Sequence, residues 1–398
     1  MIRAVFAAVL TLFAAALVGS DALGRSLRMR LPQVAADLPT AGGFDLSAKA
    51  SLMLAKGMKE GIIAPIKLEH SQKEEIGRLS RAALRQEPLN DEALRNLALL
   101  ANDAGRTKEA RRLMRASVEI TKRNLAASMW LALDDAKLGR MDASLAMYDQ
   151  GLRANSQAQE LVIPAMAQSL KADRMVAPIT RLLLRNPPWL ADFWASAPRF
   201  NDAHRNLAKI RLELAKRNVR IDPASNRTLI EALAGTGHFA EAEDLIARLG
   251  GGRAIVRNAE FDRQPEYLPF DWQPRFDASL TAELDSRAGV LRISTFGDSS
   301  GPAASQLVAL PATAYRLEVR VKDWEASQSR LIYFKVRCAE AGNNSESLPI
   351  ALDLGQLAVA LNKPASSCTY NWLTIFAAPS KREGAASVAL DRVALVAR

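Results

Sequence analysis

Two different spacings of apolar residues divide the chain. From Leu46 to about Gly250 apolar residues recur every three or four positions, in blocks separated by Gly, Asn or Pro, which predicts amphipathic helices. Beyond that point apolar and polar residues alternate in short runs such as Tyr315–Lys322 and Ile332–Cys338, which predicts antiparallel strands with one solvated face. Three consecutive glycines, Gly250 to Gly252, separate the two patterns. Because glycine is costly in a helix interior and permits most backbone directions, we place a domain boundary there.

The helical blocks repeat. Gly105 and Gly139 are 34 residues apart, and so are Asn90 and Asn124. A 34-residue period, with a glycine turn between two helices and the small residue Ala110 where the helices cross, resembles the tetratricopeptide repeat over about residues 71–250. The resemblance implies a solenoid of helix pairs that binds a protein partner along its concave face and carries no chemistry of its own.

Prolines and aromatic residues interrupt this period. Pro164 and Pro178 are expected in the first turn of their helices, where proline is tolerated. Residues 186–200 combine two tryptophans and two phenylalanines with three prolines. Such a cluster either packs inside the array or lines a ligand groove, and we favour packing because large aromatic side chains mostly supply burial.

The strand-rich part carries a second resemblance. An opening Asn258–Phe261 segment is followed by Pro269–Trp272, a Gly289–Ile293 strand, a Gln306–Pro311 segment and a closing Leu390–Val393 strand. This order is similar to that of the jelly-roll carbohydrate-binding modules, over about residues 254–398. The resemblance implies a galactose-binding-like antiparallel β-sandwich in which a sugar contacts a sheet face or the loops.

Sugar recognition needs flat aromatic faces beside planar polar groups. We expect the glycan-binding contacts at Tyr267, Trp272 and Trp324, with Asp323 as the polar neighbour of Trp324. Trp372 lies inside an alternating run, so the sequence favours a core position for it.

The two cysteines and the first residues indicate the compartment. Cys338 and Cys368 both lie in the strand-rich part, which favours one disulfide in an oxidising compartment over two buried thiols. Fifteen residues from Ala4 to Val18 contain only one polar residue, Thr11. We therefore expect residues 1–22 to be a signal peptide or an uncleaved membrane anchor, followed by a linker over residues 23–45.

Charge and motifs exclude several classes of function. The chain has a net charge of +10, but its Lys and Arg residues are scattered rather than gathered in a block, so we expect no nucleic-acid partner. The segment Gly297–Pro302 is similar to the nucleophile segment of chymotrypsin-like proteases, but no histidine follows His238 to accept the serine proton. Because His70, His204 and His238 are isolated, no metal site is expected, and nothing points to a cofactor.

These observations predict an α plus β multidomain protein: a signal or anchor at 1–22, a linker at 23–45, a helical repeat domain at 46–250 and a sandwich at 251–398. We expect a protein that is not an enzyme, with its bulk in the periplasm and anchored to the inner membrane or exported. Its array would dock a protein partner, and its sandwich would contact a polysaccharide during exopolysaccharide or cell-envelope assembly. The alternative is a purely structural scaffold that binds no sugar, and a glycan hydrolase or lyase is a third reading.

Overall fold

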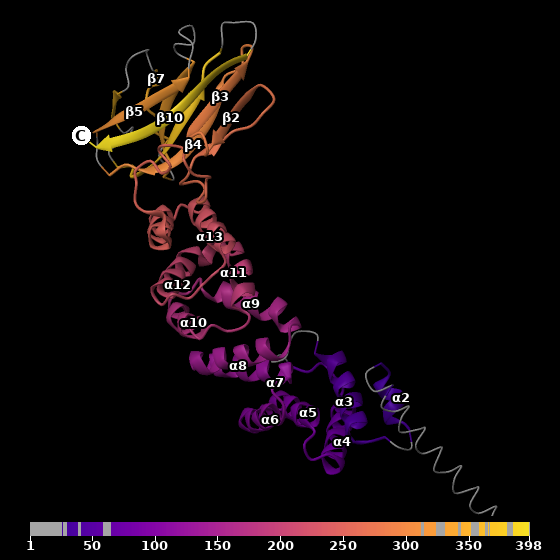
Figure 1. Cartoon of the computed structure of the whole chain (residues 1–398). Coiled ribbons are helices and arrows are strands. Elements are labelled where there is room, and N and C mark those ends of the chain that lie inside the picture. The colour runs from indigo at the N-terminus through magenta and orange to yellow at the C-terminus, as the bar shows by residue number, and fades with distance from the viewer. Residues whose placement is uncertain are drawn as a thin grey trace, which may run out of the picture. The chain divides into compact units, whose positions relative to one another are not determined.

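Helices occupy the first part of the chain and strands the last (Figure 1). This computed structural model describes residues 26, 30–38, 41–58, 65–311, 314–323, 331–340, 344–351, 358–362, 365, 367–379 and 385–397. The α-helices are α2 Pro32–Ala36, α3 Gly43–Gly57, α4 His70–Gln86, α5 Asp91–Asp103, α6 Thr107–Ile120, α7 Leu125–Lys137, α8 Met141–Ala154, α9 Gln157–Ser169, α10 Val176–Leu183, α11 Leu190–Ser196, α12 His204–Lys216, α13 Pro223–Gly235 and α14 Phe239–Ile246. Short helical turns are η1 Asp173–Met175, η2 Ala197–Arg199, η3 Asn201–Ala203 and η4 Ala247–Gly251.

The 34-residue period corresponds to equivalent structural positions in two successive helix pairs. Asn90 and Asn124 are the N-caps of α5 and α7, and their side-chain oxygens accept hydrogen bonds from Ala93 N at 2.9 Å and Ala127 N at 3.2 Å. These bonds satisfy backbone donors that a helix start leaves without a partner. The helices α5 with α6, and α7 with α8, pack as antiparallel hairpins, which confirms the expected helical array at this level.

Glycines follow α5, α7 and α13, each the first helix of its pair. Gly105 and Gly139 have φ of 76° and 74°, a left-handed conformation that residues with a Cβ rarely adopt. Gly237, between α13 and α14, has φ of 78° and repeats the arrangement at the end of the array. The glycines of the sequence repeat are therefore required by the backbone at each turn.

Two local features differ from the sequence expectation. The stretch 23–45 contains α2 and the start of α3, because Pro32 suits the first turn of a helix and Asp45 accepts a hydrogen bond from Gly42 N at 2.9 Å. Pro164 lies inside α9 rather than in its first turn, since that helix already begins at Gln157. Pro178 does lie in the first turn, of α10.

The aromatic cluster of residues 186–200 is core. Trp189 is 1% exposed, Phe193 is fully buried and Trp194 is 1% exposed, so packing accounts for these rings. The indole of Trp189 donates a hydrogen bond to Asp149 at 2.9 Å. His204 is also buried, between Pro198 O at 2.7 Å and the Thr236 hydroxyl at 3.1 Å, and is thus a satisfied structural histidine.

The described strands form two five-stranded antiparallel sheets, as the fold class predicts. Sheet A has the order β1-β4-β9-β6-β7 and sheet B the order β2-β3-β10-β5-β8. Their bounds are β1 Gln273–Pro274, β2 Leu280–Asp285, β3 Val290–Phe296, β4 Gly301–Ala309, β5 Ala314–Asp323, β6 Ile332–Cys338, β7 Ile350–Ala351, β8 Ala358–Asn362, β9 Tyr370–Ala377 and β10 Ala385–Ala397. One core, with Phe261, Trp272, Tyr315 and Phe334 among its rings, is built from residues of both sheets.

Contacts divide the chain into two compact units whose boundary lies within the helices. The first unit is Met1–Met166 with Ala177–Asp192, and the second is Ala167–Val176 with Phe193–Arg398. The helices α12 to α14 therefore belong to the same unit as the sandwich. The glycine seam, which is the run Gly250 to Gly252, marks the change from the helical to the strand-rich part, and η4 ends at Gly251. The expected signal or anchor, residues 1–22, lies outside the described residues; among the described helices, none combines the length and apolar character needed to cross a bilayer.

Candidate functional site

The outer face of sheet A presents aromatic side chains that alternation along β9 directs away from the core. Asn371, Leu373, Ile375 and Ala377 are buried, whereas the intervening side chains are only partly covered. Because successive strand residues point to opposite faces, Trp372, Thr374 and Phe376 share the outer face. The sequence interpretation of Trp372 as core is corrected: the run does alternate, but the apolar set that faces the core is the one containing Leu373 and Ile375.

Cross-strand register arranges this face in three rows. Trp372 of β9 lies opposite Arg337 of β6, and Phe376 lies opposite Tyr333. The row between them runs across four strands in the order Lys335, Thr374, Ser305, Gln273. Directly opposite residues on neighbouring antiparallel strands project to the same side of the sheet. The face therefore combines aromatic rings at both ends with a polar row between them.

At the Phe376 end of the face, ring stacking and a lysine contact hold the aromatic side chains in place. The rings of Tyr333 and Phe376 are stacked, with centroids 5.1 Å apart and planes inclined by 10°. The Lys335 ammonium lies 5.5 Å from the Phe376 centroid and 3.4 Å from the Glu346 carboxylate. These contacts fix the platform before any ligand arrives, because both rings and the lysine already have partners.

A shallow depression of about 540 Å³ lies on this face. It is lined by Gln273, Pro302, Ser305, Lys335, Arg337, Glu346, Trp372, Thr374 and Phe376. An open surface with few apolar rings and several hydrogen-bonding groups suits a polar, extended ligand better than a small apolar molecule, which prefers an enclosed pocket.

Two of the residues predicted from the sequence to contact sugar are buried at the start of the sandwich. Tyr267 is 7% exposed and Trp272 is fully buried, with the Trp272 ring 5.8 Å from that of Phe261. Trp324 lies outside the described residues, and Asp323 is the last residue of β5. Hence the described face around Trp372 contains none of these four.

Tyr267 belongs to a segment that joins the helices of the second unit to the sandwich. Asp271 pairs with Arg257 at 2.9 Å and accepts hydrogen bonds from Glu266 N at 2.9 Å and Tyr267 N at 2.8 Å. Arg257 in turn donates to Gly251 O at 2.5 Å, at the end of η4, and lies 5.5 Å from the Tyr267 ring centroid. The pKa of the Tyr267 phenol is raised to about 12, mainly by burial and secondly by a hydrogen bond to Glu266.

The start of β9 makes a second such connection. Tyr370 packs against Phe239 of α14 with ring centroids 5.2 Å apart, and its hydroxyl donates to the Glu243 carboxylate at 2.9 Å. Burial and the Glu243 carboxylate raise the pKa of Tyr370 well above its ordinary value. The last helix is therefore fixed to the same strand that carries Trp372, two residues further on.

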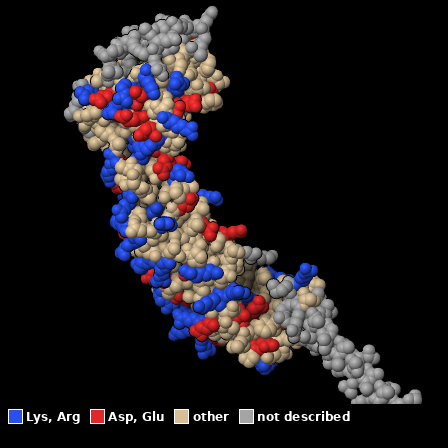
Figure 2. All heavy atoms as spheres, viewed as in Figure 1, with Lys and Arg blue, Asp and Glu red and all other residues tan. Residues whose placement is uncertain are grey.

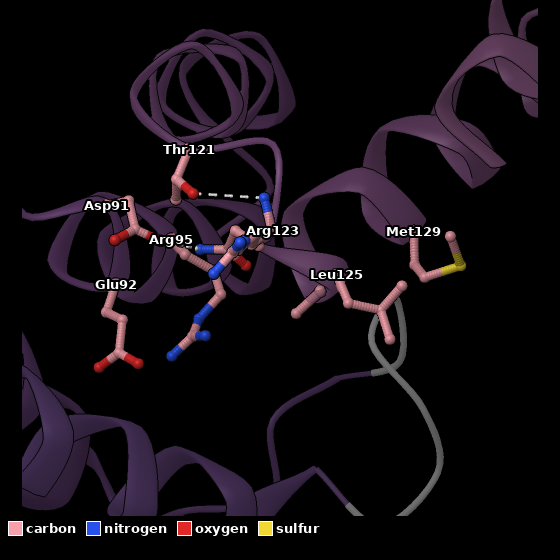
Figure 3. Close-up of a pocket in the computed structure, with 9 residues that line it drawn as sticks. Asp91, Glu92, Arg95, Thr121, Arg123, Leu125 and Met129 are labelled. Atoms are coloured by element: carbon pink, nitrogen blue, oxygen red, sulfur yellow. Dashed lines mark hydrogen bonds between the residues drawn. The ribbon is translucent and has the colours of Figure 1, made fainter. Parts of the chain in front are cut away.

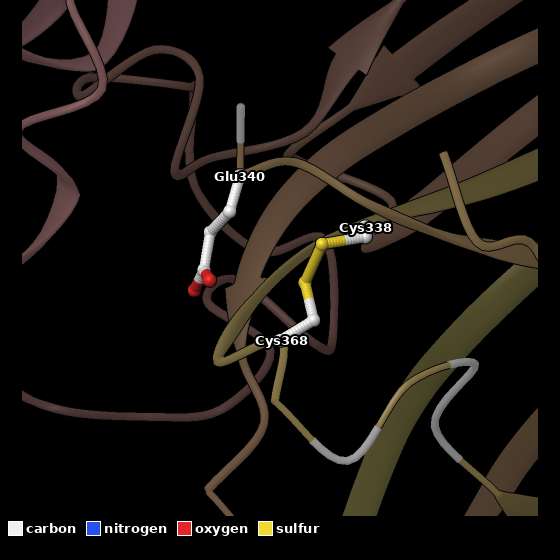
Figure 4. A group of neighbouring side chains, drawn as sticks. All are labelled: Cys338, Glu340 and Cys368. Carbon is white, nitrogen blue, oxygen red and sulfur yellow. A yellow bond between two sulfur atoms is a disulfide. The ribbon is translucent and has the colours of Figure 1, made fainter. Parts of the chain in front are cut away.

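The disulfide between Cys338 and Cys368 supports that connection (Figure 4). The two Cα atoms are 5.9 Å apart and the cysteines are 30 residues apart in sequence. Glu340 lies beside the bridge and accepts hydrogen bonds from Thr369 N at 2.8 Å and Tyr370 N at 3.0 Å. Because both sulfur atoms are bonded to each other, this trio of side chains offers no thiolate to a metal ion.

A second depression, of about 690 Å³, lies on the helical array between α5 and α7 (Figure 3). Asp91, Glu92 and Arg95 contribute from α5, Leu125 and Met129 from α7, and the loop between α6 and α7 supplies Thr121, Arg123 and Asn124. The Arg95 guanidinium donates to Ser51 at 2.6 Å, and burial lowers its pKa. This surface offers charges of both signs beside two apolar side chains, which suits a peptide segment.

Charge is dispersed over one visible face of the molecule (Figure 2). The face seen in Figure 2 carries Lys and Arg side chains interspersed with Asp and Glu on both the helical part and the sandwich.

Ser299 and Ser300, within the protease-like segment, lie in the turn between β3 and β4. The described histidines all lie on the helical part.

The fold and these surfaces define a multidomain α plus β protein in which helical hairpins precede an antiparallel β-sandwich. No protein-family model and no curated protein matches the chain. Similar solved structures include that of TmCBM61 in complex with β-1,4-galactotriose, which is 17% identical. That match covers 37% of this chain and 99% of the other, with a TM-score of 0.23.

Proposed function

We propose that the sandwich is a glycan-binding module and that its contact surface is the open face of sheet A around Trp372. The observation that supports this proposal most strongly is a partly exposed Trp372 in a depression lined by Gln273, Lys335 and Arg337. The C–H groups of a sugar ring stack on a flat aromatic face, while amide, ammonium and guanidinium groups bond to its hydroxyls.

The spacing of the rings indicates the size of the ligand. Trp372 and Phe376 are four residues apart on one strand, which corresponds to about 14 Å. A ligand that contacts both rings must therefore be longer than one sugar ring, and the polar row between them would meet its hydroxyls. We infer an oligosaccharide segment of a polysaccharide that lies along β9.

For the rest of the chain we propose an envelope protein with no catalytic role. Residues 1–22 would direct export or anchor the protein at the inner membrane, and the bulk would lie in the periplasm. The disulfide supports this proposal because such bonds persist in oxidising compartments. The helical array would dock a protein partner through the depression between α5 and α7, during exopolysaccharide or cell-envelope assembly.

A test of the array compares two substitutions of apolar by acidic residues. Met129→Glu places a charge in the depression, whereas Leu138→Glu changes a side chain that is 51% exposed at the end of α7. We expect an envelope protein that co-purifies with the wild type to be lost with Met129→Glu and retained with Leu138→Glu. Equal retention by both variants would exclude this depression as the docking surface.

A purely structural scaffold is the second candidate, and the burial of Tyr267 and Trp272 favours it. These rings, nominated for sugar contact, instead pack in the segment that joins the helices to the sandwich. Under this hypothesis the sandwich is a structural domain at the end of the helices, and the aromatic face of sheet A binds a protein.

Affinity electrophoresis of the purified full-length protein in gels containing polysaccharides separates the two candidates. We expect Trp372→Ala to lower glycan affinity about 30-fold or more, the effect of removing a dominant aromatic contact. Phe296→Ala is the matched control, because Phe296 is 47% exposed on β3 of sheet B, away from the depression. If no polysaccharide retards the wild type, the glycan proposal fails and the scaffold is the remaining candidate. If a polysaccharide retards Trp372→Ala and Phe296→Ala as strongly as the wild type, the face around Trp372 is not the glycan site.

A further inference from the structure

The open face of sheet A has more positive than negative charge at the position of Trp372. Lys335 and Arg337 project from the same side of β6, and Glu346 is the acidic residue that lines the depression with them. Although Glu346 forms a bridge opposite Arg337, its carboxylate lies 3.4 Å from the ammonium of Lys335. The carboxylate of Glu346 therefore pairs with Lys335, and the charge of Arg337 is not balanced by a residue that lines the depression.

Among the described residues that line the depression, Arg337 is the cation without an ion-pair partner. Lys335 has both the Glu346 carboxylate and the face of the Phe376 ring as partners. The Arg337 side chain is exposed, and among the described residues no carboxylate forms an ion pair with it. Its guanidinium is thus free to bind an anion from outside the protein.

Register places Arg337 next to the aromatic platform. Arg337 lies directly opposite Trp372 on the neighbouring strand, and paired residues of this kind have Cβ atoms about 5 Å apart. A substituent at the edge of a sugar stacked on Trp372 falls within reach of the guanidinium. The planar guanidinium, which presents parallel N–H donors, binds a carboxylate through two hydrogen bonds, a geometry that a hydroxyl does not match.

We propose that the glycan is acidic, with an anionic group on the sugar that stacks on Trp372 bound by Arg337. This inference rests on the proposed glycan-binding function and specifies its ligand class. Carboxylates of uronic acids and sulfate or phosphate esters share the required chemistry. Phe376 and Tyr333 would contact the next sugar of the glycan. That sugar needs no charge, because Lys335 beside these rings is already paired with Glu346.

The test uses full-length protein in affinity gels that contain polygalacturonate, dextran sulfate or neutral β-1,4-galactan. We expect the wild type to prefer one or both acidic polymers, and Arg337→Gln to weaken that binding about tenfold, the value of a strong charge-assisted hydrogen bond. The neutral polymer should bind more weakly and respond little to Arg337→Gln. Retention by polygalacturonate identifies a carboxylate, and retention by dextran sulfate alone identifies an ester; either supports an acidic ligand.

Arg292→Gln is the matched control for general attraction to polyanions. Arg292 is an exposed arginine on β3 of sheet B, so the substitution removes the same charge from the other sheet. Equal weakening by Arg292→Gln and Arg337→Gln would overturn the inference, because net charge alone would then explain binding. Equal affinity for neutral and acidic polymers, both abolished by Trp372→Ala, would also overturn it while leaving the proposed glycan function in place. Failure of every polymer to bind would remove both.

Discussion

The Arg257–Asp271 pair should be the most sensitive point of the segment between the helices and the sandwich. Its side chains are only 9% and 6% exposed, and Asp271 also accepts two backbone hydrogen bonds. In Asp271→Ala the Arg257 guanidinium stays buried and keeps the Gly251 and Gly252 carbonyls as hydrogen-bond partners, but it loses the carboxylate that balanced its charge. Removing one partner of a buried ion pair costs about 3–5 kcal/mol, because the other charge is then uncompensated.

Hydrogen exchange at the Leu307 amide measures this loss. That amide donates to Pro269 O at 2.9 Å, so its exchange requires the segment to open. We expect Asp271→Ala to accelerate its exchange by about a hundredfold to a few thousandfold, which corresponds to about 3–5 kcal/mol of opening free energy. The control Asp262→Ala removes an ion pair whose side chains are 61% and 67% exposed, and it should change exchange little.

The double variant Arg257→Met with Asp271→Ala tests the physical reason. If the uncompensated charge causes most of the loss, removing that charge as well should restore part of the protection. Two outcomes would refute the reasoning. One is an acceleration of exchange below about fivefold in Asp271→Ala. The other is a loss of opening free energy in the double variant that exceeds the sum of the losses in Arg257→Met and Asp271→Ala.

Three further predictions concern other parts of the chain. Cys338→Ser with Cys368→Ser should lower the free energy of unfolding of the second unit by about 3.5 kcal/mol, measured by urea denaturation; no change would mean that the bridge does not constrain the unfolded chain. Gly139→Ala should destabilise its turn by about 1 kcal/mol because φ is 74°, whereas Gly235→Ala, in a helix with open space around it, should be neutral or stabilising in thermal melts; the reverse order would contradict the turn assignment. Because the folded-state pKa of Tyr267 is raised to about 12, its contribution to stability is complete below pH 10 and is lost as the pH rises from 10 to 12; Tyr267→Phe should flatten that decline, and a tyrosinate absorbance titration with an ordinary pKa would contradict it.

The helical and strand-rich parts could be predicted because their signals are local. Asn90, Gly105, Asn124 and Gly139 act through their own turns and caps, so their spacing alone indicates the helix pairs. Pro164 shows the limit of such reasoning, since the start of α9 depends on how far the helix extends before the proline. The sequence marks the preference of a residue for a helix position, whereas packing decides where the helix begins.

The aromatic residues show a different limit. Alternation in β9 correctly indicates that Trp372 and Leu373 face opposite sides, but either set could face the core. Trp272 and Tyr267 lie among turn residues, so the sequence favours exposure of both rings. The ion pair of Asp271 instead holds this segment against the sandwich. Arg337 has no local signal at all, because its significance comes from its position opposite Trp372, 35 residues further along the chain.

The sequence by itself determined the order of helix and strand, the turn glycines and the caps, because these depend on interactions between residues a few positions apart. Only the tertiary structure decided which aromatic rings are exposed, since burial depends on which strands pair and which segment covers a sheet edge. It also brought Tyr370, Glu340 and Glu243 together at the end of the helices, and left Arg337 without a carboxylate partner among the described residues. The glycine seam from Gly250 to Gly252 remains the point where helix gives way to strand, but long-range contacts place the last helices and the sandwich in one unit.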